Sequence, residues 1–200
     1  QHTSNHIILY LKAMKIFPNE IYHIYNQGNN REKIFHETED YLTFLTLVRK
    51  TVFQNSSILA WCLMPNHFHF LVYATEHSAA SKVVGNIVSC ELSNAFRLLQ
   101  SEYAQFINKK YNRSGSLFRQ KAQAKSTAEG SSLYHYIAFN YIHQNPLKAG
   151  IVNSLGDWPY SSYPDYLGKR NGNLCDKLMA EKFIGINYNR FEEETLNTIP

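Results

Sequence analysis

Residues 57–73 read SILAWCLM-PN-HFHFLVY, and this stretch predicts a β-hairpin. Ser57–Met64 and His67–Tyr73 are short apolar runs with many aliphatic and aromatic side chains, which is typical of strands packed into a core. Pro65-Asn66 separates the two runs and favours a tight turn. The two strands are therefore expected to pair with each other.

Two histidines begin the second of these strands. Successive side chains of a strand point to opposite faces, so His67 and His69 share one face while Phe68 points the other way, toward the core. Two convergent imidazoles form half of a divalent-metal site. The alternative is a pair of surface or hydrogen-bonded histidines, and nine histidines in the chain make a chance pair easy.

Further elements follow from the hydrophobic pattern on either side of this hairpin. Before it we expect a strand at Ile21–Tyr25, a turn or bulge at Gln27–Asn30 and a helix that Thr38 caps. After it we expect a helix capped by Ser78 with the apolar face Val84, Ile87, Val88, Leu92 and Phe96, a strand within Gln120–Thr127, and a helix from Ser131 or Ser132 to about Gln144, which Asn145-Pro146 ends.

The resulting order is β-α-β-β-α-β with one added helix. This order predicts an α+β fold of the ferredoxin-like, split β-α-β type. Two helices would cover one face of the sheet and leave the other face free for a ligand or partner. A length of 200 residues and a hydrophobic fraction of 44% fit one compact domain.

Composition excludes several classes of protein. No apolar run is long enough to span a bilayer, and Gln1–Asn19 has no recognisable secretion signal. The three cysteines, Cys62, Cys90 and Cys175, are scattered and odd in number. That pattern argues against a disulfide framework or a cysteine zinc site and favours the reducing cytoplasm. A net charge of +4 permits an anionic partner without requiring one.

Basic residues are concentrated in one segment, residues 109–125, which contains no acidic residue. They are Lys109, Lys110, Arg113, Arg119, Lys121 and Lys125. Tyr111 and Phe118 lie among them. Basic groups neutralise phosphates and aromatic rings stack on unpaired bases, so the segment is a candidate nucleic-acid contact. The alternative is a solvated basic face with two core aromatics.

A second candidate group lies in the last of these helices. Tyr141 and Asn145 are one turn apart and share a helical face. The phenol is a candidate nucleophile, and the amide oxygen is a candidate third metal ligand beside His67 and His69. A metal there could polarise a phosphodiester for attack. The alternative is plain packing, because the chain has 14 tyrosines.

Four strings resemble the REP-associated branch of the HUH single-tyrosine transposases, in order and in spacing. They are PNHFH at 65–69, RSGSLF at 113–118, YIHQNPLKAG at 141–150 and WPYSSY at 158–163. The resemblance covers roughly Glu20 to Tyr163. It implies an N-terminal segment at 1–19, a transposase-like domain at 20–165 and a C-terminal extension at 166–200.

The resemblance also implies a function. Members of this family cut single-stranded DNA, commonly near hairpins, through a covalent 5′-phosphotyrosine, and rejoin it to a 3′-hydroxyl without ATP or another nucleotide cofactor. Carried over, Tyr141 is the nucleophile, and His67, His69 and Asn145 hold magnesium or manganese. The basic side chains expected to hold the DNA are Lys109, Lys110, Arg113, Arg119 and Lys121. Relatives include dimers and monomers, so a homodimer stays open.

Departures from the family pattern lie outside the proposed nucleophile and ligands. Arg119-Gln120-Lys121 stands where relatives often have Gly-Arg, and the lysine there keeps the charge but loses the bidentate fork of arginine. Lys148 stands where relatives often have arginine. Two other functions remain open. A metal phosphodiesterase would activate water and form no protein–DNA adduct, and a non-catalytic DNA-binding remnant would bind hairpins without cutting them.

Overall fold

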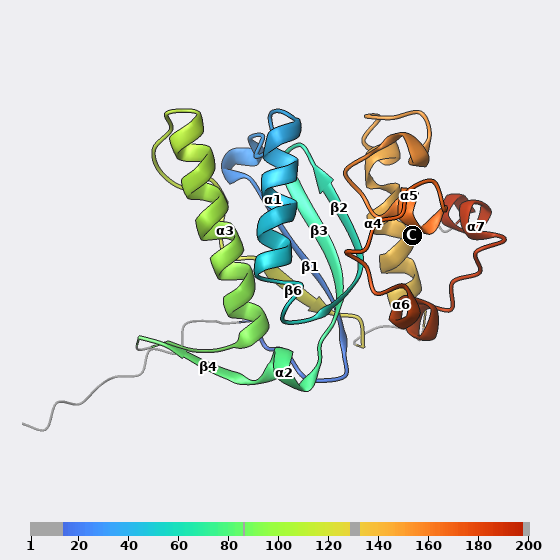
Figure 1. The fold of residues 1–200 in the computed structure, drawn as a ribbon, viewed down its shortest axis with the longest axis horizontal. Helices are drawn as coiled ribbons and strands as arrows, with labels where there is room; N and C mark the ends of the chain where they lie inside the picture. The colour runs from blue at the N-terminus through green and yellow to red at the C-terminus, as the bar shows by residue number, and fades with distance from the viewer. Residues whose placement is uncertain (1–13, 86, 129–132, 198–200) are drawn as a thin grey trace, which may run out of the picture.

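A four-stranded antiparallel sheet forms the centre of the molecule (Figure 1). The computed structural model describes residues 14–85, 87–128 and 133–197. The strands are β1 (Ile21–Gln27), β2 (Ser57–Met64), β3 (His67–Tyr73) and β6 (Gln123–Ser126), in the spatial order β2-β3-β1-β6. This is the split β-α-β arrangement that the element order predicted, with β3 inserted between β2 and β1.

The register of β1 against β3 separates the chemistry from the core. Tyr25 pairs with His69, and Gln27 pairs with His67. Directly opposed residues of an antiparallel pair point to the same face. One face of the sheet therefore carries polar and aromatic side chains from both strands, while Phe68 and its alternating neighbours project from the other face and are buried.

Two long helices cover that buried face, α1 (Thr38–Lys50) and α3 (Glu91–Lys110) (Figure 1). Phe44 of α1 and Phe96 of α3 both pack on Phe68. The predicted cap of α1 is wrong by one residue. Glu37 is the N-cap and forms a capping box with Asp40, because the Glu37 side chain accepts from the Asp40 backbone N–H and the Asp40 side chain accepts from that of Glu37. The predicted turn after β1 contains a short 3-10 helix, η1 (Asn29–Arg31).

The prediction of a single helix beginning at Ser78 is wrong over the first half of that helix. Instead the chain forms a short helix, α2 (Glu76–Ala79), and a separate hairpin of β4 (Ser81–Val84) and β5 (Ile87–Cys90). The positive φ of Gly85 suits the tight reversal between them. β-branched residues favour a strand over a helix here, and α3 begins only at Glu91, with Cys90 as its N-cap.

Helix α4 (Tyr134–Lys148) lies against β2 and β3 on the side of the histidines. The expectation that Asn145-Pro146 ends it is wrong, since Pro146 stands inside the last turn. A proline there removes one backbone donor near the helix end, where bonds from residues 149 to 151 still close the terminus. Ser131 and Ser132, the expected caps, lie outside the described residues.

The rest of the chain packs around α4. It consists of η2 (Leu155–Asp157), α5 (Tyr163–Tyr166), α6 (Lys177–Ile184) and α7 (Phe191–Asn197). Phe191 of α7 contacts Phe139 and His143 of α4. The domain boundaries at 19/20 and 165/166 stay predictions, and residues 1–13 of the first segment lie outside the described part. None of the described helices is both long and apolar enough to cross a membrane.

Candidate active site

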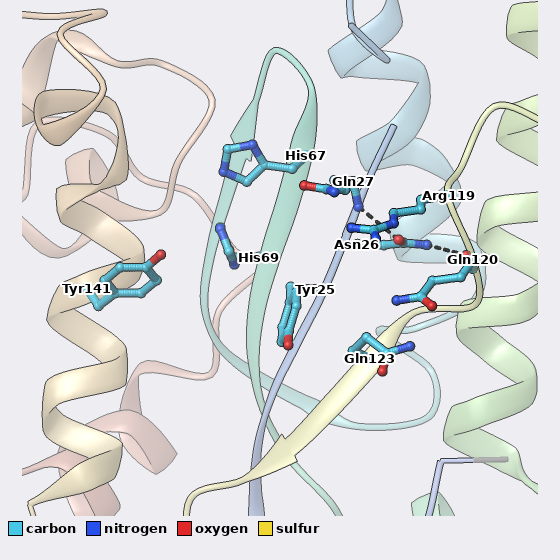
Figure 2. A pocket seen from close by; sticks show the side chains of 9 residues that line it. All are labelled: Tyr25, Asn26, Gln27, His67, His69, Arg119, Gln120, Gln123 and Tyr141. Carbon is cyan, nitrogen blue, oxygen red and sulfur yellow. Dashed lines mark hydrogen bonds between the residues drawn. The ribbon is translucent and has the colours of Figure 1, made fainter. Parts of the chain in front are cut away.

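The histidine pair of β3 lies on the sheet face that the strand period predicted. The ring centroids of His67 and His69 are 4.9 Å apart. They open into a cavity of about 450 Å³ (Figure 2). Its lining residues are Tyr25, Asn26, Gln27, His67, His69, Arg119, Gln120, Gln123 and Tyr141. At the turn before β3, the backbone N–H of Gly28 donates to the Asn66 carbonyl at 2.8 Å and holds the start of the strand in place.

Helix α4 brings Tyr141 to the same cavity. Its ring centroid lies 5.8 Å from that of His69, and its side chain points toward the histidines (Figure 2). Lys148, two turns later on α4, places its ammonium 5.6 Å from the centre of the Tyr141 ring. One chain thus supplies both the candidate nucleophile and the histidine pair, so a second copy is not needed to complete this arrangement.

Asn145 stands one turn after Tyr141 and adjoins His67. Its side-chain N–H donates to the Tyr141 backbone carbonyl at 2.8 Å. Burial lowers the pKa of His67, and a hydrogen bond with the Asn145 side chain acts in the opposite direction. The amide that the sequence offered as a third ligand therefore lies at hydrogen-bonding range of one of the two imidazoles.

Each of the two histidines is held through its Nδ1 atom. The Asn66 side chain donates to a backbone carbonyl at 3.2 Å, and its oxygen lies 2.6 Å from Nδ1 of His67. That oxygen accepts, so His67 Nδ1 carries the proton and Nε2 keeps its lone pair. Nδ1 of His69 is 2.9 Å from Nε2 of His23, a buried histidine on β1.

The Nε2 atom of His69 is buried and has no hydrogen-bond partner. Burial lowers the pKa of His69 well below its ordinary value, and the neighbouring His23 and His67 lower it further. Burial likewise lowers the pKa of His23 to about 4. Neutral imidazole is the form that binds metals. A buried, unpartnered lone pair beside a second imidazole fits a divalent ion.

A third ligand for such an ion would have to come from a side chain other than histidine, cysteine, aspartate or glutamate. No group of three histidine, cysteine, aspartate or glutamate side chains suited to a metal occurs in the described part of the chain. An amide oxygen is a weaker but accepted ligand for hard divalent ions. Asn145 interacts with His67 and stands one turn after Tyr141 on α4, and its amide oxygen would serve as the third ligand.

The five predicted DNA contacts divide into two groups. Arg119 lines the cavity, and its backbone N–H is fixed by the Gln27 carbonyl at 3.0 Å (Figure 2). Lys109 and Lys121 are exposed. Lys110 instead meets three carboxylates of the α1 start, Glu37, Glu39 and Asp40, at 2.6, 2.6 and 2.8 Å. Arg113 lies 3.2 Å from Glu32.

These ion pairs already offset the charges of Lys110 and Arg113 within the protein. DNA binding by all five residues stays a prediction, and Arg119 is the one that lies beside the histidines. Of the two aromatics in the basic segment, Phe118 belongs to the core, and the Tyr111 hydroxyl donates to Asp40 at 2.9 Å. The packing alternative therefore holds for both rings.

Two residues of β1 belong to this site although no sequence motif indicated them. His23 contacts His69, and Tyr25 lines the cavity beside it. The alternation of β1 places His23, Tyr25 and Gln27 on one face, which was visible in the sequence. What was not visible is the register that sets this face beside the histidines of β3, because it depends on pairing across 46 positions of sequence.

Together these features define a class of protein: an α+β domain whose sheet carries a histidine pair opposite a tyrosine from an added helix. The chain belongs to the IS200-like transposase family, whose model matches residues 17–145. That range includes all four candidate residues, His67, His69, Tyr141 and Asn145.

Two further similarities agree with this family. A protein of Haemophilus influenzae, described as a candidate REP-associated tyrosine transposase, is 30% identical over 108 residues, which are 52% of this chain. The chain spans 57% of the length of that relative. A solved REP-associated tyrosine transposase bound to a REP hairpin aligns over 80% of this chain and 90% of its own, with a TM-score of 0.54. At 16% identity this likeness shows the fold.

Proposed function

We propose that this protein cuts and rejoins single-stranded DNA, with Tyr141 as the nucleophile. The observation that supports the proposal is that three segments of the chain contribute side chains to one cavity. Tyr141 of α4 lies 5.8 Å, ring to ring, from His69 of β3. Arg119, from the segment before β6, lines the same space. A nucleophile, a candidate metal site and a phosphate-binding cation are the parts that phosphoryl transfer requires.

Two displacements account for cutting and joining. In the first, the Tyr141 oxygen bonds to the scissile phosphorus, the bond from phosphorus to the 3′ oxygen breaks, and the phenolic proton passes through solvent to that 3′ oxygen. In the second, a 3′-hydroxyl attacks the 5′-phosphotyrosine, and the proton it loses returns to Tyr141. Each step exchanges one P–O bond for another, so joining needs no nucleotide.

His67 and His69, with Asn145 as the third ligand, would hold the divalent ion, magnesium or manganese. When bound, such an ion supplies Lewis-acid polarisation of a non-bridging phosphate oxygen. The chain's own residues orient the reactants. Arg119 can clamp a phosphate through its guanidinium fork. The i to i+4 spacing keeps Asn145 beside Tyr141, so the nucleophile and this one ligand are carried by the same helix, while His67 and His69 are carried by β3.

Hairpin DNA is the substrate we propose. The solved relative with the same fold is described as bound to a REP hairpin, and the sequence resemblance points to the same branch. Lys109 and Lys121, from the same basic segment as Arg119, are exposed. A strand running from the histidines past Arg119 toward these lysines would have its phosphates neutralised along the way.

Tyr141→Phe tests the proposal directly. The change removes one oxygen and keeps the ring, so α4 should stay packed while cleavage and the covalent adduct fall to background. The assay mixes the protein with end-labelled single strands taken from the DNA that flanks its gene, adds manganese and resolves products on a denaturing gel. Tyr134→Phe, seven residues earlier on α4 and not among the residues that line the cavity, is the matched control and should cut normally.

The same gel separates the other two functions. A metal phosphodiesterase that activates water would still cut after Tyr141→Phe and would show no adduct in the wild type. A non-catalytic remnant would retard the hairpin in a binding assay and cut nothing under any metal. If Tyr141→Phe cuts the DNA at the rate of the wild-type protein, the tyrosine mechanism is excluded.

A further inference from the structure

An exposed aromatic ring lies in the cavity next to the histidines. Tyr25 keeps 38% of its surface exposed, although both neighbours in β1, Ile24 and Asn26, are buried. Among the exposed large hydrophobic residues of the described chain, Tyr25 is the one that lines the cavity. Its ring centroid is 5.1 Å from that of His23 and 6.0 Å from that of His69.

The register of the sheet places three side chains in a row across it. Tyr25 pairs with His69 of β3 on one side and with Gln123 of β6 on the other. All three point to the same face, and neighbouring strands lie about 4.8 Å apart. In Figure 2 the histidines stand between Tyr141 and Tyr25, and Gln123 lies beyond Tyr25. With increasing distance from the candidate nucleophile, the sheet therefore presents the imidazole of His69, the phenol ring of Tyr25 and the amide of Gln123.

This row has the chemistry that a nucleobase needs. Aromatic faces stack on bases of any sequence, and exposed rings serve as platforms in single-strand binding proteins. A glutamine amide offers one donor and one acceptor to a base edge. Gln123 donates to the Lys121 carbonyl at 3.0 Å through its Nε2 atom, which fixes the amide at the cavity wall.

We propose that Tyr25 is the stacking platform for one unpaired base next to the scissile phosphate, with Gln123 at the edge of that base. This inference rests on the proposed function for the position of the phosphate. A phosphate between Tyr141 and the histidines puts the adjoining nucleotide one strand spacing from His69, which is the position of Tyr25. Arg119, on the same cavity wall, would hold the phosphate on the far side of that base.

The test compares DNA that has bases with DNA that has none. Equilibrium binding is measured by fluorescence anisotropy on a labelled 24-nucleotide thymidine strand and on a strand of 24 abasic units with the same phosphates. Stacking of one base contributes about 5- to 150-fold in affinity. Tyr25→Leu should weaken binding of the thymidine strand by that range and leave the abasic strand unchanged. Tyr25→Phe, which keeps the aromatic face, should match the wild type on both.

Two outcomes would overturn the inference. Equal weakening on both strands would mean that Tyr25 supports the local structure, and no change on either strand would mean that no base stacks there. Manganese affinity measured by calorimetry should be unchanged in Tyr25→Leu, because the proposed ligands His67, His69 and Asn145 remain. The binding assay does not depend on cleavage, so it can be interpreted even if Tyr141 is not the nucleophile. Conversely, a negative result for Tyr25 would not contradict the role of Tyr141.

For a strand that the protein cuts, single abasic substitutions then locate the base. The wild type should lose affinity at one position beside the cut, and Tyr25→Leu should be insensitive at that position alone. A uniform profile along the strand in the wild type would contradict a subsite adjacent to the scissile phosphate.

Discussion

At the scale of single residues, the site depends on which imidazole nitrogen carries a proton. Asn66 fixes the proton of His67 on Nδ1, and His23 is placed to do the same for His69. Metal-ligating histidines commonly donate their second N–H to such a partner, which raises ligand basicity and holds the ring. His23 is thus a positioning residue in this arrangement, one hydrogen bond removed from the proposed ion.

Replacing His23 should weaken metal binding without touching a ligand. We expect His23→Ala to lower manganese affinity by about 10- to 100-fold, the range found when such outer partners are removed. His23→Gln, whose side-chain oxygen can accept from His69 Nδ1, should recover part of the loss. Titration calorimetry measures the affinity directly. His77→Ala, at an exposed histidine on α2, is the control, and equal affinities for His23→Ala and the wild type would refute the positioning role.

At the scale of elements, Lys110 joins the end of α3 to the start of α1. The Asp40 side chain is fully buried and accepts from Lys110, from the Tyr111 hydroxyl and from the backbone N–H groups of His36 and Glu37. Burial alone would raise the pKa of Asp40, but the bonds from Lys110 and its neighbours hold it below its ordinary value. A carboxyl with a lowered pKa stabilises the fold above the pKa it has in the unfolded chain, and this stability is lost as the pH falls through the folded pKa.

Lys110→Met should therefore move acid unfolding to a higher pH. The variant keeps an apolar stem but removes the cation, so the pKa of Asp40 rises and its contribution is lost earlier on acidification. Circular dichroism between pH 7 and pH 2 measures the acid midpoint. Lys109→Met, the exposed neighbour, is the matched control. Identical midpoints for the two variants would show that the Lys110 ion pairs contribute nothing to stability.

What the sequence predicted about these elements depends on how local each signal is. Side chains alternate between the two faces of a strand, so the sequence predicted that His67 and Phe68 point to opposite faces of the sheet. That prediction is confirmed. Val84, Ile87 and Val88 have a spacing that also suits a helix, so the β4–β5 hairpin was missed, although Gly85 marks its turn. The helix through Pro146 was missed for another reason, since packing of α4 on the sheet outweighs one lost backbone bond.

Contacts between distant segments were beyond local reasoning. Tyr25 and His23 reach the histidines only through the register of β1 on β3, and Lys110 meets Asp40 across 70 positions of sequence. Taken in isolation, the basic stretch therefore left two interpretations open, a nucleic-acid contact and a solvated basic face. In the fold, Lys110 and Arg113 form ion pairs with carboxylates of the protein, whereas Lys109, Arg119 and Lys121 are exposed.

At the scale of the whole molecule, the segment after α4 determines how firmly Tyr141 is held. His143 lies two residues from Tyr141, and its Nε2 atom is 2.8 Å from the Ser162 hydroxyl. The Thr195 hydroxyl of α7 donates to Asn140 at 2.9 Å. Phe191 fills the space between these contacts and is buried against Phe139 and His143. The C-terminal helices thus support the face of α4 opposite the cavity.

Phe191→Ala should show this dependence. Truncating a buried phenylalanine costs about 3–5 kcal/mol through lost transfer free energy and the cavity left behind. We expect a loss of that size in the free energy of unfolding, measured by urea denaturation with circular dichroism. Adduct formation should fall further than the folded fraction does, because a loosened α4 holds Tyr141 less well against the histidines. Leu178→Ala, at an exposed position on α6, is the control and should change neither quantity. If adduct formation in Phe191→Ala follows the folded fraction alone, the C-terminal helices support folding but do not position the nucleophile.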